Sequence, residues 1–260
     1  MNVPIILSVI LFLLMLVIGR GKGVRSFLSL FLNFIVMLLI IVLMTNVEYN
    51  PIILTMIACI LVSCINLFFI NEVNQKTVTA FIATMITTGI LLVFIYYITK
   101  VAMIQGFGEE EIDEIVSVYS IEVGVDFLKL ATAVIILSTV AAIVDVSISI
   151  TSPMAEIYKH HPEITRKELF KSGVTIGKDI LGSNANTLFF AFIGGYLALL
   201  LWFKDLSYSF SQIVNSKIFA SEMMMIFFAG IGIALVIPIA AFINAYYLTK
   251  SKKETDSRVQ

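Results

Sequence analysis

Long runs of apolar residues without charge are the feature that most constrains how this sequence can fold. Three consecutive runs, 26–47, 49–71 and 77–99, carry no charged side chain and are each 22 or 23 residues long. A membrane-spanning helix needs about 20 such residues. The strands of a membrane β-barrel would be about ten residues long and would alternate strictly between apolar and polar positions, and the sequence shows no such alternation. The runs therefore predict membrane-spanning helices.

The composition of the whole chain excludes most other classes of protein. Hydrophobic residues make up 59% of the 260 residues and charged residues 13%, against roughly 25% charged in a soluble domain. A soluble protein could not hide so much apolar surface, and disorder requires the opposite composition. The net charge of −1 argues against a nucleic-acid partner, which needs a basic patch. We expect an all-α polytopic protein surrounded by the lipid bilayer.

We expect a single transmembrane domain over 1–250, followed by a polar cytoplasmic tail over 251–260. The seven expected spans are 2–19, 26–47, 50–71, 77–99, 127–150, 180–203 and 223–249. The first span is not expected to be a cleaved signal peptide, because its positive charges follow the apolar run instead of preceding it.

The distribution of Lys and Arg predicts the orientation. If 20–25 lies in the cytoplasm and the spans alternate from there, thirteen of these residues fall inside and four outside. Cytoplasmic connections carry the excess of Lys and Arg, so we expect the N-terminus outside and the C-terminus inside. The same order puts the acidic segment 101–126, with its run Glu109-Glu110-Glu111, on the outer side.

Asp145 is the residue that fits least well in a membrane span. A carboxylate near the centre of a spanning helix costs roughly 2.5–3.5 kcal/mol. The residues at helical spacing on its side of the fifth span are small or polar: Ser138, Ala141, Ala142, Ser149 and Ser152. The pattern predicts one polar, small-residue face and one apolar face toward lipid.

The sixth span offers a complementary stripe. Asn184, Thr187, Ala191 and Gly194 are spaced 3, 4 and 3 apart, with Asn186 beside them. Small residues let helices approach closely, and Asn or Thr can hydrogen-bond across the contact. Further polar residues of other spans are candidates for the same interior: Ser63, Asn66, Thr84, Thr87, Thr88 and Asn244.

The inner connection 153–179 predicts a short helix from about Thr165 to Ser172 that lies on the membrane surface with its apolar side down. Thr165 and Glu168 have the spacing of a capping box. Pro153 and Pro162 favour positions outside helix interiors.

No metal or cofactor site is predicted. Cys59 and Cys64 lie five apart in one span, a spacing that suits neither a disulfide nor a metal pair. His160 and His161 are adjacent and lack the spacing of metal ligands. A single deep carboxylate cannot supply a two-aspartate protease, and no nucleophile constellation is visible, so we do not expect an enzyme.

Four ordered motifs in the second half of the chain resemble the YibE/F family of bacterial membrane proteins. They are Asp145-Val146-Ser147-Ile148-Ser149-Ile150, Lys167-Glu168-Leu169-Phe170-Lys171-Ser172-Gly173, Ile176-Gly177-Lys178-Asp179-Ile180-Leu181-Gly182 and Asn186-Thr187-Leu188. The segment 21–25 and the dipeptide Asn50-Pro51 look similar too. The resemblance implies a multi-pass protein of the bacterial inner membrane, with Lys178, Asp179 and Gly182 as motif residues, but it implies no substrate or reaction.

A more distant likeness is to SecF and other membrane domains of the RND superfamily. Those proteins have six-helix halves with an Asp element in the fourth helix. Spans two to seven would match, with Asp145 in the fourth of them. The large external domain that follows the first helix in RND halves is missing, because only a short connection around 46–50 stands in its place.

Two functions remain open. The first is an inner-membrane transporter or transporter subunit, proton-coupled through Asp145, with Ser149, Asn184, Asn186 and Thr187 around it. The second is a non-transporting scaffold or assembly factor in which Asp145 only joins helices. In either case we expect a homo-oligomer or a pairing with a related YibE/F-type subunit, because one six-helix half would leave a large face uncovered.

Overall fold

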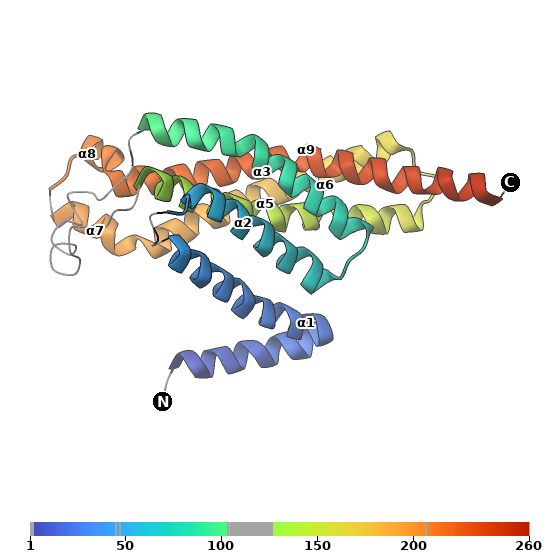
Figure 1. The fold of residues 1–260 in the computed structure, drawn as a ribbon, viewed down its shortest axis with the longest axis horizontal. Helices are drawn as coiled ribbons and strands as arrows, with labels where there is room; N and C mark the ends of the chain where they lie inside the picture. Colours follow the sequence, from blue (N-terminus) through green and yellow to red (C-terminus); the bar gives the residue numbers. More distant parts are fainter. Residues whose placement is uncertain are drawn as a thin grey trace.

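The computed structural model describes residues 3–44, 46, 48–102, 104, 127–205 and 207–259, and these residues are helical apart from short connections (Figure 1). The elements are α1 (Val3–Met44), α2 (Pro51–Cys64), the π-helical segment η1 (Ile65–Phe69), α3 (Gln75–Ala102), α5 (Phe127–His160), α6 (Arg166–Gly195), α7 (Leu197–Asp205), α8 (Phe210–Asn215) and α9 (Lys217–Val259). This confirms the all-α prediction. The acidic segment expected outside lies, for most of its length, beyond the described residues.

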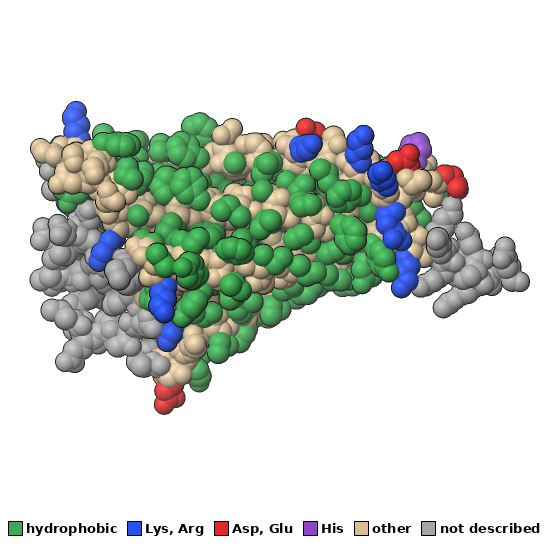
Figure 2. Space-filling view, turned by 90° about the horizontal axis from the view of Figure 1, so that it is seen from above, with side chains coloured by type: hydrophobic (Ala, Val, Ile, Leu, Met, Phe, Trp, Pro, Cys, Tyr) green, Lys and Arg blue, Asp and Glu red, His purple; other side chains and the backbone are tan. Residues whose placement is uncertain are grey.

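Five helices are long and apolar enough to cross a membrane. They cover Val3–Met44, Pro51–Phe69, Gln75–Ala102, Leu128–His160 and Lys217–Lys250. Figure 2 shows a face on which hydrophobic side chains cover most of the length of the bundle, with most Lys and Arg side chains toward its two ends and a basic and an acidic side chain together between them. The structure therefore supports a membrane protein with several spanning helices.

The first two expected spans lie in one bent helix. α1 is interrupted at Arg20, whose backbone has φ 47 and ψ −130, and its two arms fold back on each other in a V (Figure 1). Gly23 is required at this bend because a Cβ there would overlap the carbonyl oxygen of Met15 in the other arm. The segment expected as a loop is thus a helix kink.

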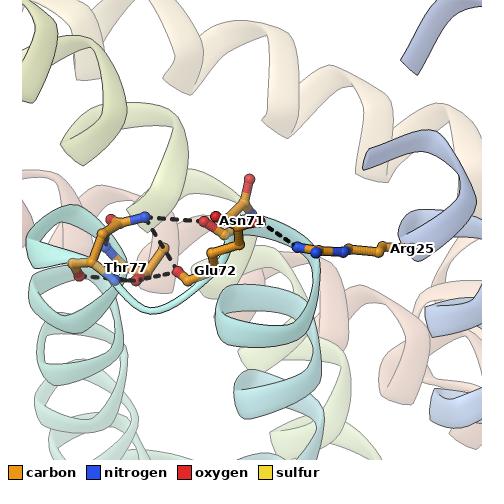
Figure 3. A network of polar contacts seen from close by, with 5 residues as sticks. Arg25, Asn71, Glu72 and Thr77 are labelled. Carbon is orange, nitrogen blue, oxygen red and sulfur yellow. Dashed lines mark hydrogen bonds and ion pairs between the residues drawn. The ribbon is translucent and has the colours of Figure 1, made fainter. Parts of the chain in front are cut away.

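The turn before α3 is fixed by a polar network (Figure 3). Asn74 and Thr77 hydrogen-bond reciprocally, with each backbone N–H donating to the other side chain, at 2.9 and 3.1 Å. Glu72, at φ 62, forms an ion pair with Arg25 at 2.6 Å. This pair ties the second arm of α1 to the turn between η1 and α3.

The core lies where α3, α5, α6 and α9 pack together. Two glycines permit the closest contacts. At Gly232 of α9, a Cβ would lie 3.0 Å from Ile143 Cδ1 and 3.2 Å from Leu91 Cδ1. At Gly173 of α6, it would lie 2.9 Å from the Cβ of Ala241 and against Met154. The bundle is therefore packed closely enough that an added methyl group would displace a neighbour.

The expected orientation of the fifth span is reversed. The apolar side of α5, which includes Ile143, Val146 and Ile150, is fully buried in the core. Its polar side, with Asp145 and Ser149, is exposed on the surface of the chain. Hydrophobic patterning identified the two faces but not which of them the neighbouring helices would cover.

The inner connection also differs from expectation. α5 continues through Pro153 to His160, which a spanning helix tolerates when neighbouring helices support it. The predicted capping box is confirmed, with α6 beginning after Thr165. However, α6 does not end near Ser172: it runs on to Gly195, since no residue before that point breaks the helix. The stretch expected as the sixth span is interrupted at Tyr196 and continues in α7.

Candidate functional site: a polar face on α5 and α6

Asp145 and Ser149 lie on the outward face of α5, directly opposite the buried side of that helix. Ser138, Ala142 and Ser152 on the same face are half-buried. Within the described part of the chain, the carboxylate of Asp145 makes no hydrogen bond or ion pair. The structure thus leaves a carboxylate on the surface of a membrane-spanning helix.

The neighbouring helix α6 carries two more charges in a similar position. Lys178 and Asp179 are exposed, and neither side chain has a hydrogen-bonding or ionic partner among the residues described. Gly177, just before them, packs on α9, where a Cβ would lie 2.9 Å from Ile237 Cγ1. The core side of α6 is therefore small and apolar, and its outer side is charged.

These three ionisable residues lie at a similar depth. On α9, Gly232 contacts Ile143 of α5, and the side-chain amide of Asn244 donates to Thr151 O at 3.0 Å. Asp145 lies between these two contacts of α5. α6 runs antiparallel to α9, since Gly173 lies against Ala241 and Gly177 against Ile237. Counted along the helices from these contacts, Lys178 and Asp179 lie within about one helical turn of the depth of Asp145.

This depth is well inside the apolar length of the bundle. Ile237 lies 13 residues before Lys250 and 20 residues after Lys217, or about 20 and 30 Å along a helix. Asp145 therefore lies inside the apolar length of α5, 11 residues before Glu156. Lys178 and Asp179 lie at the start of the uncharged run of α6, and Lys178 is seven residues after Lys171, or about 10 Å along the helix.

The other predicted site residues do not bridge α5 and α6. Asn184 is half-buried, and its side-chain amide donates to Ile180 O at 3.1 Å, within α6. Thr187 Oγ1 donates to Ser183 O at 2.9 Å, also within the helix. Asn186 and Gly182 are exposed, and no atom lies within 4 Å of the position of a Cβ at Gly182. The predicted polar and small-residue stripe thus lies on α6, but it makes no hydrogen bond to α5.

Hydrogen bonds between helices come from different residues, deeper in the bundle. Asn244, fully buried, accepts from Thr79 Oγ1 at 3.0 Å and donates to Thr151 O, so that it joins α3, α5 and α9. Thr84 Oγ1 and Ser147 Oγ add a second α3–α5 contact at 3.1 Å. Asn244 and Thr84 were candidates in the sequence, whereas Thr79 and Thr151 carried no signal beyond being polar residues in apolar helices.

Most buried threonines are satisfied within their own helix. Thr87, Thr99 and Thr139 each donate to the carbonyl four residues earlier, at 2.6 to 2.8 Å. This back-bonding lets a hydroxyl lie in an apolar interior without a partner on another helix.

The N-terminal end of α6 is anchored to α9 and lies beside α5. A cavity of about 450 Å³ lies between α5 and α6, and its lining residues are Ile157, Glu168, Lys171, Ser172, Thr175 and Ile176. Hydrogen bonds from the hydroxyl and the amide of Thr165 hold the pKa of the Glu168 carboxyl below its usual value. Arg166 donates to Thr249 Oγ1 at 3.1 Å and lies over the ring of Tyr246.

Among the described residues, no three His, Cys, Asp or Glu side chains gather closely enough to hold a metal ion. Cys59 is buried and Cys64 half-buried, and both are free thiols. The structure thus directs attention to the ionisable residues of α5 and α6.

The fold and this site define a polytopic helical membrane protein with an ionisable residue, Asp145, inside the apolar length of one helix. A family model described as YibE/F-like protein matches residues 7–250. The chain belongs to this family. No curated protein and no solved structure matches it, so the likeness to SecF and RND proteins rests on the sequence pattern alone.

Proposed function

We propose that this chain is a transporter, or a subunit of one, in the bacterial inner membrane, proton-coupled through Asp145. One observation carries the proposal: Asp145 lies inside the apolar length of α5, Lys178 and Asp179 lie at a similar depth on the adjacent helix α6, and none has a partner in the described chain. Ionisable residues are expensive there and commonly mark ion or substrate pathways.

In this proposal Asp145 binds and releases the proton. When the carboxyl is protonated, the outward face of α5 is neutral and tolerates apolar surroundings. When it is ionised, it requires water, a cation or a positive side chain. Ser149 on α5 and Asn186 and Thr187 on α6 are exposed and would supply polar groups along the route. Binding or release of the proton would therefore change whether the outward face of α5 is more stable in apolar or in polar surroundings.

The proposal includes seven crossings, with the N-terminus outside and the C-terminus inside. The two arms of α1 would be the first two crossings, and α6 with α7 the sixth. Contacts between elements support this arrangement. Arg25, near the bend of α1, pairs with Glu72, which follows η1, at the expected inner side, and Lys76 Nζ lies 3.3 Å from Ser152 Oγ toward the same side of α3 and α5. Tyr196, in the outer half of the expected sixth span, donates at 2.7 Å to Glu222, which immediately precedes the seventh.

The alternative is a non-transporting scaffold or assembly factor, in which Asp145 joins helices. Within this chain that role belongs to Asn244, Thr79 and Thr84, which is why we favour transport. The two functions differ in what they require of Asp145, because hydrogen bonding survives a change to asparagine and titration does not.

The test uses purified protein in lipid vesicles loaded with a pH-sensitive dye, under an imposed proton gradient and membrane potential. We expect proton entry above that of empty vesicles, and its loss in Asp145→Asn. Glu156→Gln is the matched control, because Glu156 is an exposed carboxylate on the same helix near its inner end, paired with Lys159 and His160. Proton entry in Asp145→Asn equal to that of the unmodified protein would refute the proposal.

A further inference from the structure

We propose that the outward faces of α5 and α6 form the interface of a homodimer with a two-fold axis along the membrane normal. Asp145 of each copy pairs with Lys178 of the other. This deepens the proposed function and rests on its membrane setting, because each copy completes the charged site of its partner.

Asp145 and Lys178 require polar surroundings that the single chain does not supply. Both are exposed on the single chain, and neither has a partner among the residues described. At their depth the surroundings of a lone chain would be lipid tails, which offer no hydrogen bonds, and a charge there is unfavourable. The occupant of this face must therefore bring polar groups of opposite charge at the same depth.

A second copy meets this requirement. A two-fold axis along the membrane normal leaves the depth of every residue unchanged and brings one surface against itself. Asp145 and Lys178 lie at similar depth within the interval Gly232 to Asn244 of α9, and they lie on neighbouring helices. The face thus presents a base and two acids at similar depth, and the two-fold axis lets Lys178 of each copy pair with Asp145 of the other, while Asp179 adds a second carboxylate beside Lys178.

The shape of the face allows close approach. The outward side of α5 carries Ser138, Ala141 and Ser149 along its length, and small residues let membrane helices pack with short separations. On α6, the position of a Cβ at Gly182 is open. No large side chain at these positions would keep a second copy away from Asp145.

The first experiment traps the pair directly. Two differently tagged copies, each lacking Cys59 and Cys64, carry Asp145→Cys and Lys178→Cys respectively, and they are reconstituted together in lipid vesicles. In a two-fold dimer of these copies, the two cysteines face each other. The second, symmetry-related pair still consists of Lys178 of the first copy and Asp145 of the second. A short thiol cross-linker should then join the two tags.

The matched control replaces Asp145→Cys with Ile86→Cys. Ile86 is 45% exposed and lies on α3 two residues from Thr84, which bonds Ser147, so it has nearly the depth of Asp145 on another face. We expect at least tenfold less cross-linking. Equal cross-linking from both positions, or none from Asp145→Cys, would overturn the proposal.

The second experiment tests the charges by the association of fluorescently labelled copies in vesicles. Asp145→Lys or Lys178→Asp alone should weaken dimerisation at least tenfold, or about 1.4 kcal/mol. The double exchange should restore it, because the pair is re-formed with its charges swapped. A monomer in vesicles, a double exchange that stays monomeric, or a dimer that ignores both single changes would each refute the pairing.

These results are independent of proton entry. A dimer without proton movement would end the proposed transport and keep the interface. Proton movement by a monomer would support the proposed transport and refute the dimer interface. An interface formed only with a different polypeptide, with no cross-link between copies of this chain, would also overturn the homodimer.

Discussion

Replacing Gly177 with alanine is expected to destabilise the protein, although alanine favours helices. Relative to glycine, alanine stabilises a helix interior by about 1 kcal/mol. At Gly177, however, the new Cβ would overlap Ile237 Cγ2 and would lie 2.9 Å from Cγ1 and 3.1 Å from Cβ of the same side chain. The Cβ of Ile237 cannot rotate away, so α6 and α9 must separate, and overpacking of this kind typically costs about 1–3 kcal/mol.

Gly182→Ala on the same helix is the matched control, because no atom lies within 4 Å of the position of its Cβ. Both variants gain the same helix propensity, so the difference between them isolates the overpacking. We expect Gly177→Ala to be less stable than Gly182→Ala by about 1–3 kcal/mol, measured by equilibrium unfolding in mixed micelles. Ile237→Ala should reduce that difference in a double-mutant cycle. Equal stability of the two glycine variants would show that α6 and α9 do not meet as described.

Three further changes test other parts of the structure. Asn244→Leu removes two interhelical hydrogen bonds and should destabilise by about 1–3 kcal/mol in the same unfolding assay, at roughly 0.6–1.7 kcal/mol each; no loss would contradict the α3–α5–α9 contact. Because the pKa of Glu168 is lowered in the folded state, its contribution to stability is present above its ordinary pKa and is lost as the pH falls through the lowered value; Thr165→Ala should reduce this pH dependence, since the hydroxyl donor is lost and the backbone amide remains, and it should speed amide exchange in the first turn of α6. A cysteine within 155–170 should react with an impermeant reagent only after permeabilisation and one within 106–116 from outside, and the reverse pattern would overturn the orientation.

Local signals in the sequence predicted the spanning segments that agree with the structure. The expected spans 50–71 and 77–99 correspond to α2 with η1 and to α3, because each has an uncharged apolar run with turn residues at its ends. The capping box at Thr165 was likewise a local signal. The periodicity of apolar residues did not predict which face of a helix lies against lipid and which lies against other helices. Lipid tails and a membrane-protein interior are equally apolar, so the two faces of α5 could be distinguished but not assigned.

The sequence predicted only part of the candidate site, because it did not show which helix faces meet. Asp145 and Ser149 share a face, as expected, but Asn184 and Thr187 are satisfied within α6 and make no bond to α5. Lys178 and Asp179 entered only as motif residues. The depth of Lys178 and Asp179 relative to Asp145 is set by the packing of Gly177 of α6 against α9. A contact between helices that are distant in the sequence cannot be predicted from a local motif.

The threonines that bond to their own helices have a mechanical consequence. Thr87 on α3 and Thr139 on α5 keep their hydrogen bonds when one helix slides against another, since donor and acceptor travel together. Only a few bonds, such as those of Asn244, must break if α5 shifts along α3 and α9. The interior therefore resists unfolding through close packing, yet offers little resistance to a small axial displacement.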